Sequence, residues 1–413
     1  MYQTMKKRKQ CEKIFATALL AALPLAAMAQ YEEGSENGVV SLAGREGFSI
    51  QTKKADFVFK PYLLVQTAAN INWYDDEGLD KAYNQDNLAN SGFAVPYAVL
   101  GFTGKAWGKV SFNLSVNAAA SGGAILQQAW IDVAMKEAFA VRIGKFKTPF
   151  SHGYLTTLGE TMMPALPTSL TAAVIMPYSL NAVTPNIGTG FDLGVEIHGF
   201  AANKFGYEIG IFNGSGASVN TATKTISDDW HIPSLLYAGR LTFMPKGIMP
   251  ATQGNPDRLH EDKWMLGMSA NLNVESENES TNDTRAGLEF AMLKNKLYVG
   301  AEAYYMHVGF TDRQKIDKTY DFLGGYVQGG YFVAPRVQVA ARYDFFNRNG
   351  VDTDGFLNMP AVGCNYFFKN CNLKLQAMYQ FIGRTGHDTQ LDRDNDDLGL
   401  SKHSGTIQLQ YSF

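Results

Sequence analysis

Apolar and polar residues alternate along much of this chain. The alternation is clearest over residues 108–118 (GKVSFNLSVNA), 190–200 (GFDLGVEIHGF), 336–346 (RVQVAARYDFF) and 406–413 (TIQLQYSF). Successive side chains of a strand point to opposite faces, so this period of two indicates strands with one apolar face. Aromatic residues stand at both ends of many of these faces, which is typical of strands that cross a membrane and less usual for a soluble sandwich. The pattern therefore predicts membrane-spanning β-strands.

Sixteen such segments follow one another. We expect strands at residues 55–73, 94–106, 108–119, 126–136, 138–147, 188–200, 204–213, 235–245, 262–274, 284–294, 296–310, 320–334, 336–347, 358–368, 371–383 and 403–413. The gaps alternate between short and long, as expected for tight periplasmic turns and long extracellular loops. The gap at 246–261 is an exception, because it falls on the short side and is long. The predicted fold is all-β, a 16-stranded antiparallel transmembrane β-barrel with both chain ends in the periplasm.

The N-terminus has the features of an export signal. A basic start is followed by the apolar run IFATALLAALPLAAMA, which ends on a small-residue cleavage pattern at Ala27-Met28-Ala29. We expect residues 1–29 to be a signal peptide, 30–54 a short polar periplasmic segment and 55–413 the barrel. A retained helical anchor is the alternative, but Pro24 and the shortness of the run argue against it.

One apolar stretch, residues 161–185, does not follow the alternation. It carries no charge, yet its four prolines exclude a spanning helix. It belongs to the gap after the fifth strand, in which Glu160 is the only formal charge. Apolar residues need burial, and the barrel interior offers it. We therefore predict that residues 148–187 form an inward-folded third extracellular loop that narrows the channel; packing over the barrel mouth or against a neighbouring subunit is the alternative.

The same loop contains one short predicted helix. In PTSLTAAVIMP, Thr168 or Ser169 would cap the helix and Pro177 would end it. We place Glu160, Thr168 and Ser169 at the constriction.

Residues 141–151, VRIGKFKTPFS, resemble the hallmark motif of the phosphate-selective porin O and P family. The lead-in at 44–66, the rhythm of sixteen segments and the terminal Phe413 are also similar to this family, so the resemblance covers nearly all of the mature chain. It implies a homotrimeric sixteen-stranded barrel in the outer membrane of a Gram-negative bacterium, with the third loop in the pore. It also implies uptake of anions along arginine and lysine side chains. The final QYSF looks like the signal that barrel-assembly machinery reads, which marks Tyr411 and Phe413 as assembly residues.

The inward positions of the predicted strands carry charges of both signs. The basic candidates for pore lining and anion binding are Arg142, Arg240, Arg285, Arg336, Arg342 and Lys374, and the acidic candidates are Asp132, Asp192, Glu196, Glu208, Glu289, Glu302 and Asp344. This near balance departs from an arginine ladder and favours a modest anion preference. Lys145 and Lys147, where the fifth strand enters the loop, are candidates for a local anion site. The alternative is that all these residues pair with carboxylates or face water.

The remaining sequence offers no catalytic or metal-binding pattern. A formal net charge of −3 gives no reason to expect a nucleic-acid partner, and the seven histidines lack metal-ligand spacing. We expect no catalytic site, no metal and no cofactor. Cys364 and Cys371 fall on the lipid-facing register and are expected to be free thiols rather than a disulfide. Residues 392–403 resemble a calcium loop but lack its glycine and glutamate, so a solvated loop is preferred.

These features predict a passive outer-membrane porin for small hydrophilic solutes, including inorganic anions such as phosphate. A structural or adhesive barrel that presents its loops and an enzyme on a barrel scaffold are the alternatives. Sixteen strands leave an aqueous channel, which favours transport. The expected partners are the lipid bilayer, small anionic or neutral solutes, the barrel-assembly machinery and further copies of the chain in a homotrimer.

Overall fold

The computed structural model describes residues 39–44, 47–74, 90–175, 190–214, 235–258, 260–273, 282–309, 319–347, 356–385 and 402–413. The predicted signal peptide, the helix end at Pro177 and the calcium-like stretch lie outside these residues.

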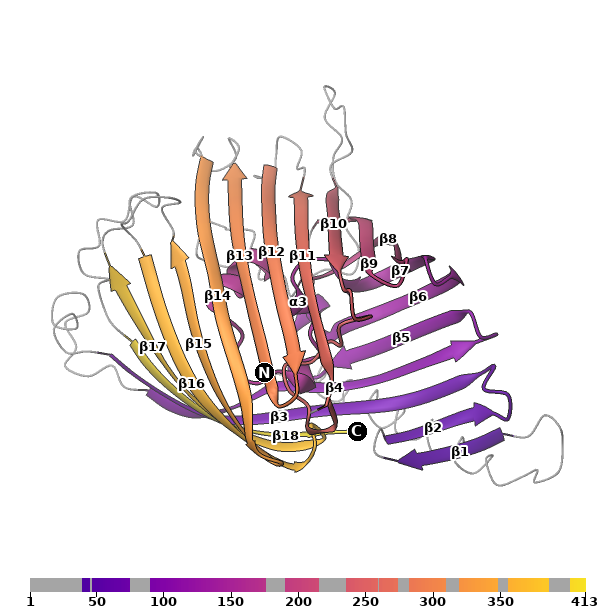
Figure 1. Ribbon diagram of the computed structural model, residues 1–413, viewed down its shortest axis with the longest axis horizontal. Coiled ribbons are helices and arrows are strands. Elements are labelled where there is room, and N and C mark those ends of the chain that lie inside the picture. Colours follow the sequence, from indigo (N-terminus) through magenta and orange to yellow (C-terminus); the bar gives the residue numbers. More distant parts are fainter. Residues whose placement is uncertain are drawn as a thin grey trace, which may run out of the picture.

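Sixteen antiparallel strands, β3–β18, form a closed barrel (Figure 1). They are β3 Val58–Tyr74, β4 Asn90–Ala106, β5 Val110–Asn117, β6 Leu126–Lys136, β7 Phe139–Lys147, β8 Phe191–Ala201, β9 Phe205–Phe212, β10 Leu236–Phe243, β11 Asp262–Asn273, β12 Asn282–Lys294, β13 Leu297–Gly309, β14 Thr319–Ala334, β15 Val337–Asn347, β16 Phe356–Lys369, β17 Leu373–Thr385 and β18 Lys402–Ser412. Each strand pairs with the next in sequence, and β18 pairs with β3 to close the ring. The predicted fold is confirmed, and every predicted strand agrees with an observed one to within a few residues.

The two faces of the strands differ in exposure as the alternation predicts. On the outer face Leu114, Ile143 and Leu288 are 47%, 57% and 62% exposed, whereas Ser115 on the inner face is 1% exposed. Many other large apolar side chains are exposed on this face. Their exposure is unfavourable in water but favourable in contact with lipid. Among the described residues, no helix is long and apolar enough to cross a membrane.

The N-terminal lead-in differs from the prediction. Residues Val39–Gly44 (β1) and Gly47–Thr52 (β2) form an antiparallel hairpin, where the sequence indicated only a polar segment up to residue 54. β2 continues onto the barrel through two residue pairs with β3, among them Ile50 with Phe59. Each hairpin strand has only six residues, too few for a reliable periodicity.

The C-terminus seals the seam between the last and first strands. Phe413 and Leu63 exchange two backbone hydrogen bonds, of 3.1 and 3.2 Å. The side chains of Tyr411 and Phe413 contact each other with ring centroids 6.2 Å apart, and Tyr411 is 49% exposed on the outer face. The aromatic end of the chain therefore belongs to the barrel wall.

Candidate pore constriction

The segment after β7 turns into the barrel (Figure 1). Its described part, residues 148–175, contains α3 His152–Leu155, η3 Leu158–Glu160 and α4 Thr168–Ile175. Phe150 and Leu170 are at most 1% exposed. They belong to a cluster with inner-wall side chains of β13–β16, namely Tyr304, Met306, Phe322, Tyr326, Phe346, Leu357 and Met359. The inward fold of the loop is confirmed, and its reason is the burial of these apolar groups inside the barrel.

Glu302 on β13 fixes the first turn of the loop. Its carboxylate accepts hydrogen bonds from the Ser151 hydroxyl (2.5 Å) and the Gly153 N–H (2.6 Å) of the loop. It also accepts from the hydroxyls of Tyr304 (2.6 Å) and Tyr326 (2.8 Å) on the wall. A Cβ at Gly153 would lie 2.3 Å from the Tyr326 hydroxyl, so this close approach requires glycine. A buried carboxylate with four donors is a strong attachment point.

Helix α4 is attached to the wall at its N-terminus. The Asp344 carboxylate of β15 accepts the N–H groups of Thr168 (2.5 Å) and Ser169 (3.3 Å) and the Ser169 hydroxyl (2.5 Å). The predicted helix is therefore confirmed, but its predicted cap is wrong, because the Ser169 hydroxyl donates to Asp344 rather than capping the helix. An anionic group at a helix N-terminus compensates both unpaired N–H groups and the helix dipole. The Arg285 guanidinium donates to the carbonyl of Ala173 in the same helix (2.6 Å).

The middle of the loop lies along a row of polar side chains from β15–β18. Gln410 donates to the carbonyl of Gly159 (2.9 Å), and Asn365 donates to the carbonyl of Met162 (2.8 Å). Lys374 and Gln376 both donate to the carbonyl of Thr161, and Arg342 donates to that of Ala165 (2.8 Å). The inner wall thus satisfies backbone carbonyls that the loop cannot pair within itself.

A second segment enters the barrel from the opposite end. Residues 246–261, the connection of β10 to β11 that was too long for its side, contact the loop directly. The N–H of Gln253 donates to the Glu160 carbonyl (3.0 Å), and the N–H of Thr157 donates to the Ala251 carbonyl (3.1 Å). The Asn255 amide donates to the Glu160 carboxylate (3.2 Å). We call residues 246–261 the inserted turn, and its length is explained by this contact; it includes η4 Pro256–Arg258.

Two of the basic candidates form ion pairs on the inner wall. Arg240 contacts Glu208 and Glu289, each at 2.8 Å. Arg142 contacts Asp132 at 2.9 Å and Glu196 at 3.4 Å. The carboxylates around Arg142 come from the neighbouring strands β6 and β8, whereas those around Arg240 come from β9 and, two strands away, from β12.

The structure therefore separates the basic candidates by what they contact. Arg285, Arg342 and Lys374 hold loop carbonyls, and Lys145 on β7 is fully buried. Arg336 is exposed in the turn between β14 and β15, so its predicted place on the inner face is wrong. Pairing with carboxylates, the alternative named above, describes Arg142 and Arg240, whereas Arg285, Arg342 and Lys374 bind backbone carbonyls, which the sequence did not indicate. Anion binding by any of these residues stays a prediction.

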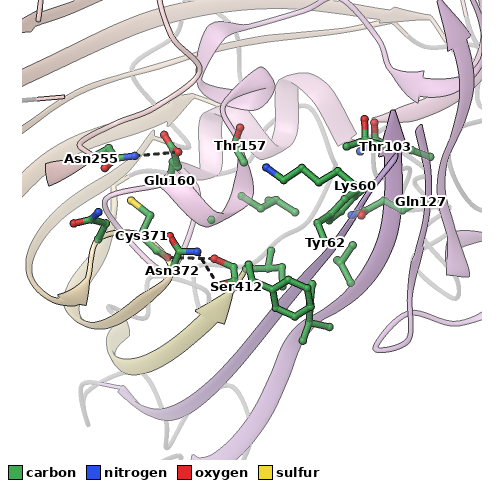
Figure 2. A pocket seen from close by; sticks show the side chains of 18 of the residues that line it. Lys60, Tyr62, Thr103, Gln127, Thr157, Glu160, Asn255, Cys371, Asn372 and Ser412 are labelled. Carbon is green, nitrogen blue, oxygen red and sulfur yellow. Dashed lines mark hydrogen bonds between the residues drawn. The ribbon is translucent and has the colours of Figure 1, made fainter. Parts of the chain in front are cut away.

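A cavity of about 780 Å³ remains between the loop and the wall of β3–β7. Lys60, Tyr62 and Thr103 line it from the wall, and Thr157 and Glu160 line it from the loop. In Figure 2 the Lys60 side chain points toward the loop that carries these two residues. Further lining groups are Gln127, Gln128, Lys147, Asn255, Asp257, Glu261, Asn370, Asn372 and Ser412. Apolar side chains, among them Leu64, Val99 and Phe191, complete the lining, so the cavity is of mixed polarity. Polar and charged groups in the lining of a cavity beside an inward loop are compatible with an aqueous passage.

Three titratable groups outside the strands are perturbed by burial. Burial lowers the pKa of His152 to about 3, and the nearby Arg240 cation acts in the same direction. Nε2 of His152 has no hydrogen-bond partner within the described part of the chain. Burial raises the pKa of the Cys371 thiol to about 12 and that of Tyr154 well above its ordinary value.

The cysteines show one error of the sequence analysis. Both are free thiols, as predicted. Cys364 is exposed, but Cys371 is buried and lines the cavity, so its predicted lipid-facing position is wrong. The register shift between Phe367 and Lys369 at the end of β16 changes the face that Cys371 presents.

Several cavity residues were not among the predicted site residues. Lys60 is one of them, although it shares a face of the first strand with Tyr62 and the buried Gln66, and that alternation was the available signal. Asp257 and Glu261 belong to the inserted turn, whose unusual length was the one available signal. Among the described residues, no group of three or more histidine, cysteine, aspartate or glutamate side chains has metal-site geometry.

A closed sixteen-stranded barrel with a loop folded into its lumen and a cavity beside that loop defines a porin-type channel. The chain belongs to the phosphate-selective porin O and P family, whose sequence model matches residues 65–413. A β-barrel of this family lies in the outer membrane and forms a channel rather than an enzyme.

Known proteins similar to this chain are distant in sequence. An uncharacterized protein of Aquifex aeolicus (strain VF5) is 23% identical over 302 residues, which cover 70% of this chain and 68% of that protein. The anion-selective porin from Comamonas acidovorans has a TM-score of 0.57 and 10% identity, covering 86% of this chain and all of that one. The in-vitro folded, trimer form of OmpT of Vibrio cholerae has a TM-score of 0.52 and 11% identity, with coverages of 86% and 99%. At these identities the two structures show the fold alone.

Proposed function

We propose that this protein is a passive outer-membrane porin that lets small hydrophilic solutes diffuse through the cavity beside the inward loop. The observation that carries the proposal is the cavity of about 780 Å³ between the β3–β7 wall and the loop, whose lining includes charged and other polar side chains. A plugged adhesive barrel would need no such passage, and no catalytic cluster accompanies it among the described residues.

Inorganic anions such as phosphate are within the proposed range of solutes. Lys60 and Lys147 line the cavity and support entry of anions, and the family description points the same way. The preference is expected to be weak, because Arg142 and Arg240 contact carboxylates and Arg285 contacts the loop. An arginine that is already paired contributes little additional field to the passage.

Export and assembly complete the proposal. Residues 1–29 serve as a signal peptide, and the Tyr411–Phe413 end is the region that the barrel-assembly machinery recognises. A homotrimer is the proposed assembly, supported by the barrel fold shared with a protein whose structure is described as a trimer form.

Conductance in a planar lipid bilayer tests the proposal. Purified protein should give stepwise, ohmic conductance, and a salt gradient should give a reversal potential that shows only a small preference for anions. Lys60→Glu should move that potential toward cation selectivity. Lys246→Glu is the matched control, because Lys246 is exposed and pairs with Asp262 outside the cavity. Absence of conductance would refute the porin function, and block by micromolar phosphate would refute the weak selectivity.

A further inference from the structure

Two charged residues of the cavity form hydrogen bonds to neutral groups, although the Lys374 ammonium also attracts the carboxylate of one of them, Glu160. The ammonium of Lys147, at the end of β7, donates to the backbone carbonyls of Tyr154 and Thr156. The Glu160 carboxylate accepts from the Asn255 amide. This differs from the ion pairs of Arg142 and Arg240, in which opposite charges cancel within 2.8–3.4 Å.

Three further charged residues line the cavity. Lys60 adds a cation on β3, whereas Asp257 and Glu261 add anions on the inserted turn. The Asp257 carboxylate accepts from the Asn370 amide at 2.6 Å. The basic groups therefore belong to strands of the barrel wall and the acidic groups to the loop and the inserted turn, and Figure 2 shows Lys60 and Glu160 on opposite sides of the cavity.

We propose that this cavity is a binding and selectivity site for compact zwitterionic solutes, such as amino acids and short peptides, held between Lys60 and Lys147 on one side and Glu160 on the other. The proposal rests on the porin function proposed above and specifies its solute class. A single ion in the cavity is attracted by one side and repelled by the other. A solute that carries an ammonium and a carboxylate a few bonds apart gains an attractive contact on both sides.

The inserted turn is what makes this arrangement possible. Gln253 and Asn255 hold the backbone and carboxylate of Glu160, so the loop's single formal charge between residues 148 and 175 is kept at the cavity. The Thr252 and Gln253 side chains are 0% and 3% exposed, which shows that this part of the turn is packed inside the barrel. The turn thereby supplies both a support for Glu160 and two further carboxylates.

Swelling of proteoliposomes tests the proposal with three solutes of similar size. Glycylglycine is a zwitterion, N-acetylglycinamide is neutral, and N-acetylglycine is an anion at neutral pH. We expect glycylglycine to enter about two- to fivefold faster than N-acetylglycinamide, which corresponds to one partly exposed ion pair. Its rate should also exceed that of N-acetylglycine.

Charge-removing variants assign the effect to the two sides. Glu160→Gln and Lys60→Gln should each reduce the ratio of the glycylglycine rate to the N-acetylglycinamide rate to about one. This ratio is independent of how much protein enters the vesicles. Asp262→Asn is the matched control, since Asp262 pairs with Lys246 at an exposed site, and it should keep the wild-type ratio. Equal rates of the dipeptide and the amide through the wild type, or an unchanged ratio in both variants, would overturn the zwitterion site alone. Vesicles that swell with none of the solutes would overturn the porin function and this proposal together.

Discussion

Replacement of Glu302 by leucine should release the inward loop. The change keeps the bulk of the side chain but removes the acceptor for the Ser151 hydroxyl and the Gly153 N–H. A hydrogen bond to a charged group contributes about 1.5–3 kcal/mol, so the docked loop loses about 3–6 kcal/mol. The buried side chains of Phe150 and Leu170 still favour docking by about 1.5–3 kcal/mol each. The contacts of Asp344, Asn365 and Lys374 with the rest of the loop remain, so the release is local to the turn at residues 151–153. A loss of about 3 kcal/mol raises the undocked population of that turn about a hundredfold.

Single-channel recording should detect this release as excess open-channel noise and a higher mean conductance. Glu302→Gln should have a smaller effect. The amide oxygen still accepts from the Gly153 N–H, and the Ser151 and Tyr304 hydroxyls can accept hydrogen bonds from the amide nitrogen instead of donating to a carboxylate oxygen. Asp321→Leu is the matched control: Asp321 on β14 has an exposed side chain that accepts from Tyr305 and His307. A correctly folded Glu302→Leu channel with wild-type noise would show that Glu302 does not hold the loop.

Three further predictions follow from single groups. His152 has a pKa of about 3 when the loop is docked and near 6.5 when the loop is released. Docking is therefore strongest above pH 6.5 and weakens by about 1.4 kcal/mol per pH unit as the pH falls toward 3. Channel noise should rise at pH 5, and His152→Gln should lack this rise. Cys371 has a pKa of about 12 in the folded barrel, and only the thiolate reacts with a maleimide. At pH 8 it should therefore react roughly a thousandfold more slowly in the folded barrel than in unfolded protein. Equal rates would contradict its burial. Deletion of Phe413 removes two backbone hydrogen bonds to Leu63 at the barrel seam and should lower the yield of heat-modifiable folded barrel on gels, with unchanged unit conductance in what does fold.

The limits of the sequence analysis are clearest at the inner wall. Alternation correctly predicted which residues face inward on most strands, including Arg240, Arg285 and Glu302, but not what they would contact. Arg240 pairs with carboxylates of β9 and β12, whereas Arg285 binds the loop helix, and both lie in equivalent patterns along the chain. The difference depends on which part of the loop lies opposite each arginine, which periodicity does not contain.

The sequence by itself determined the number of strands, the lipid-facing row and the inward direction of the loop. Each follows from a local property, because a period of two selects the strand faces and an apolar, nearly uncharged segment must be buried somewhere. Only the tertiary structure decided the partners of the inner charges, the entry of residues 246–261 and the position of the cavity. Those features depend on contacts between residues far apart in sequence, such as the Gln66–Gln410 hydrogen bond across 344 positions, and such contacts exist only once the barrel has closed.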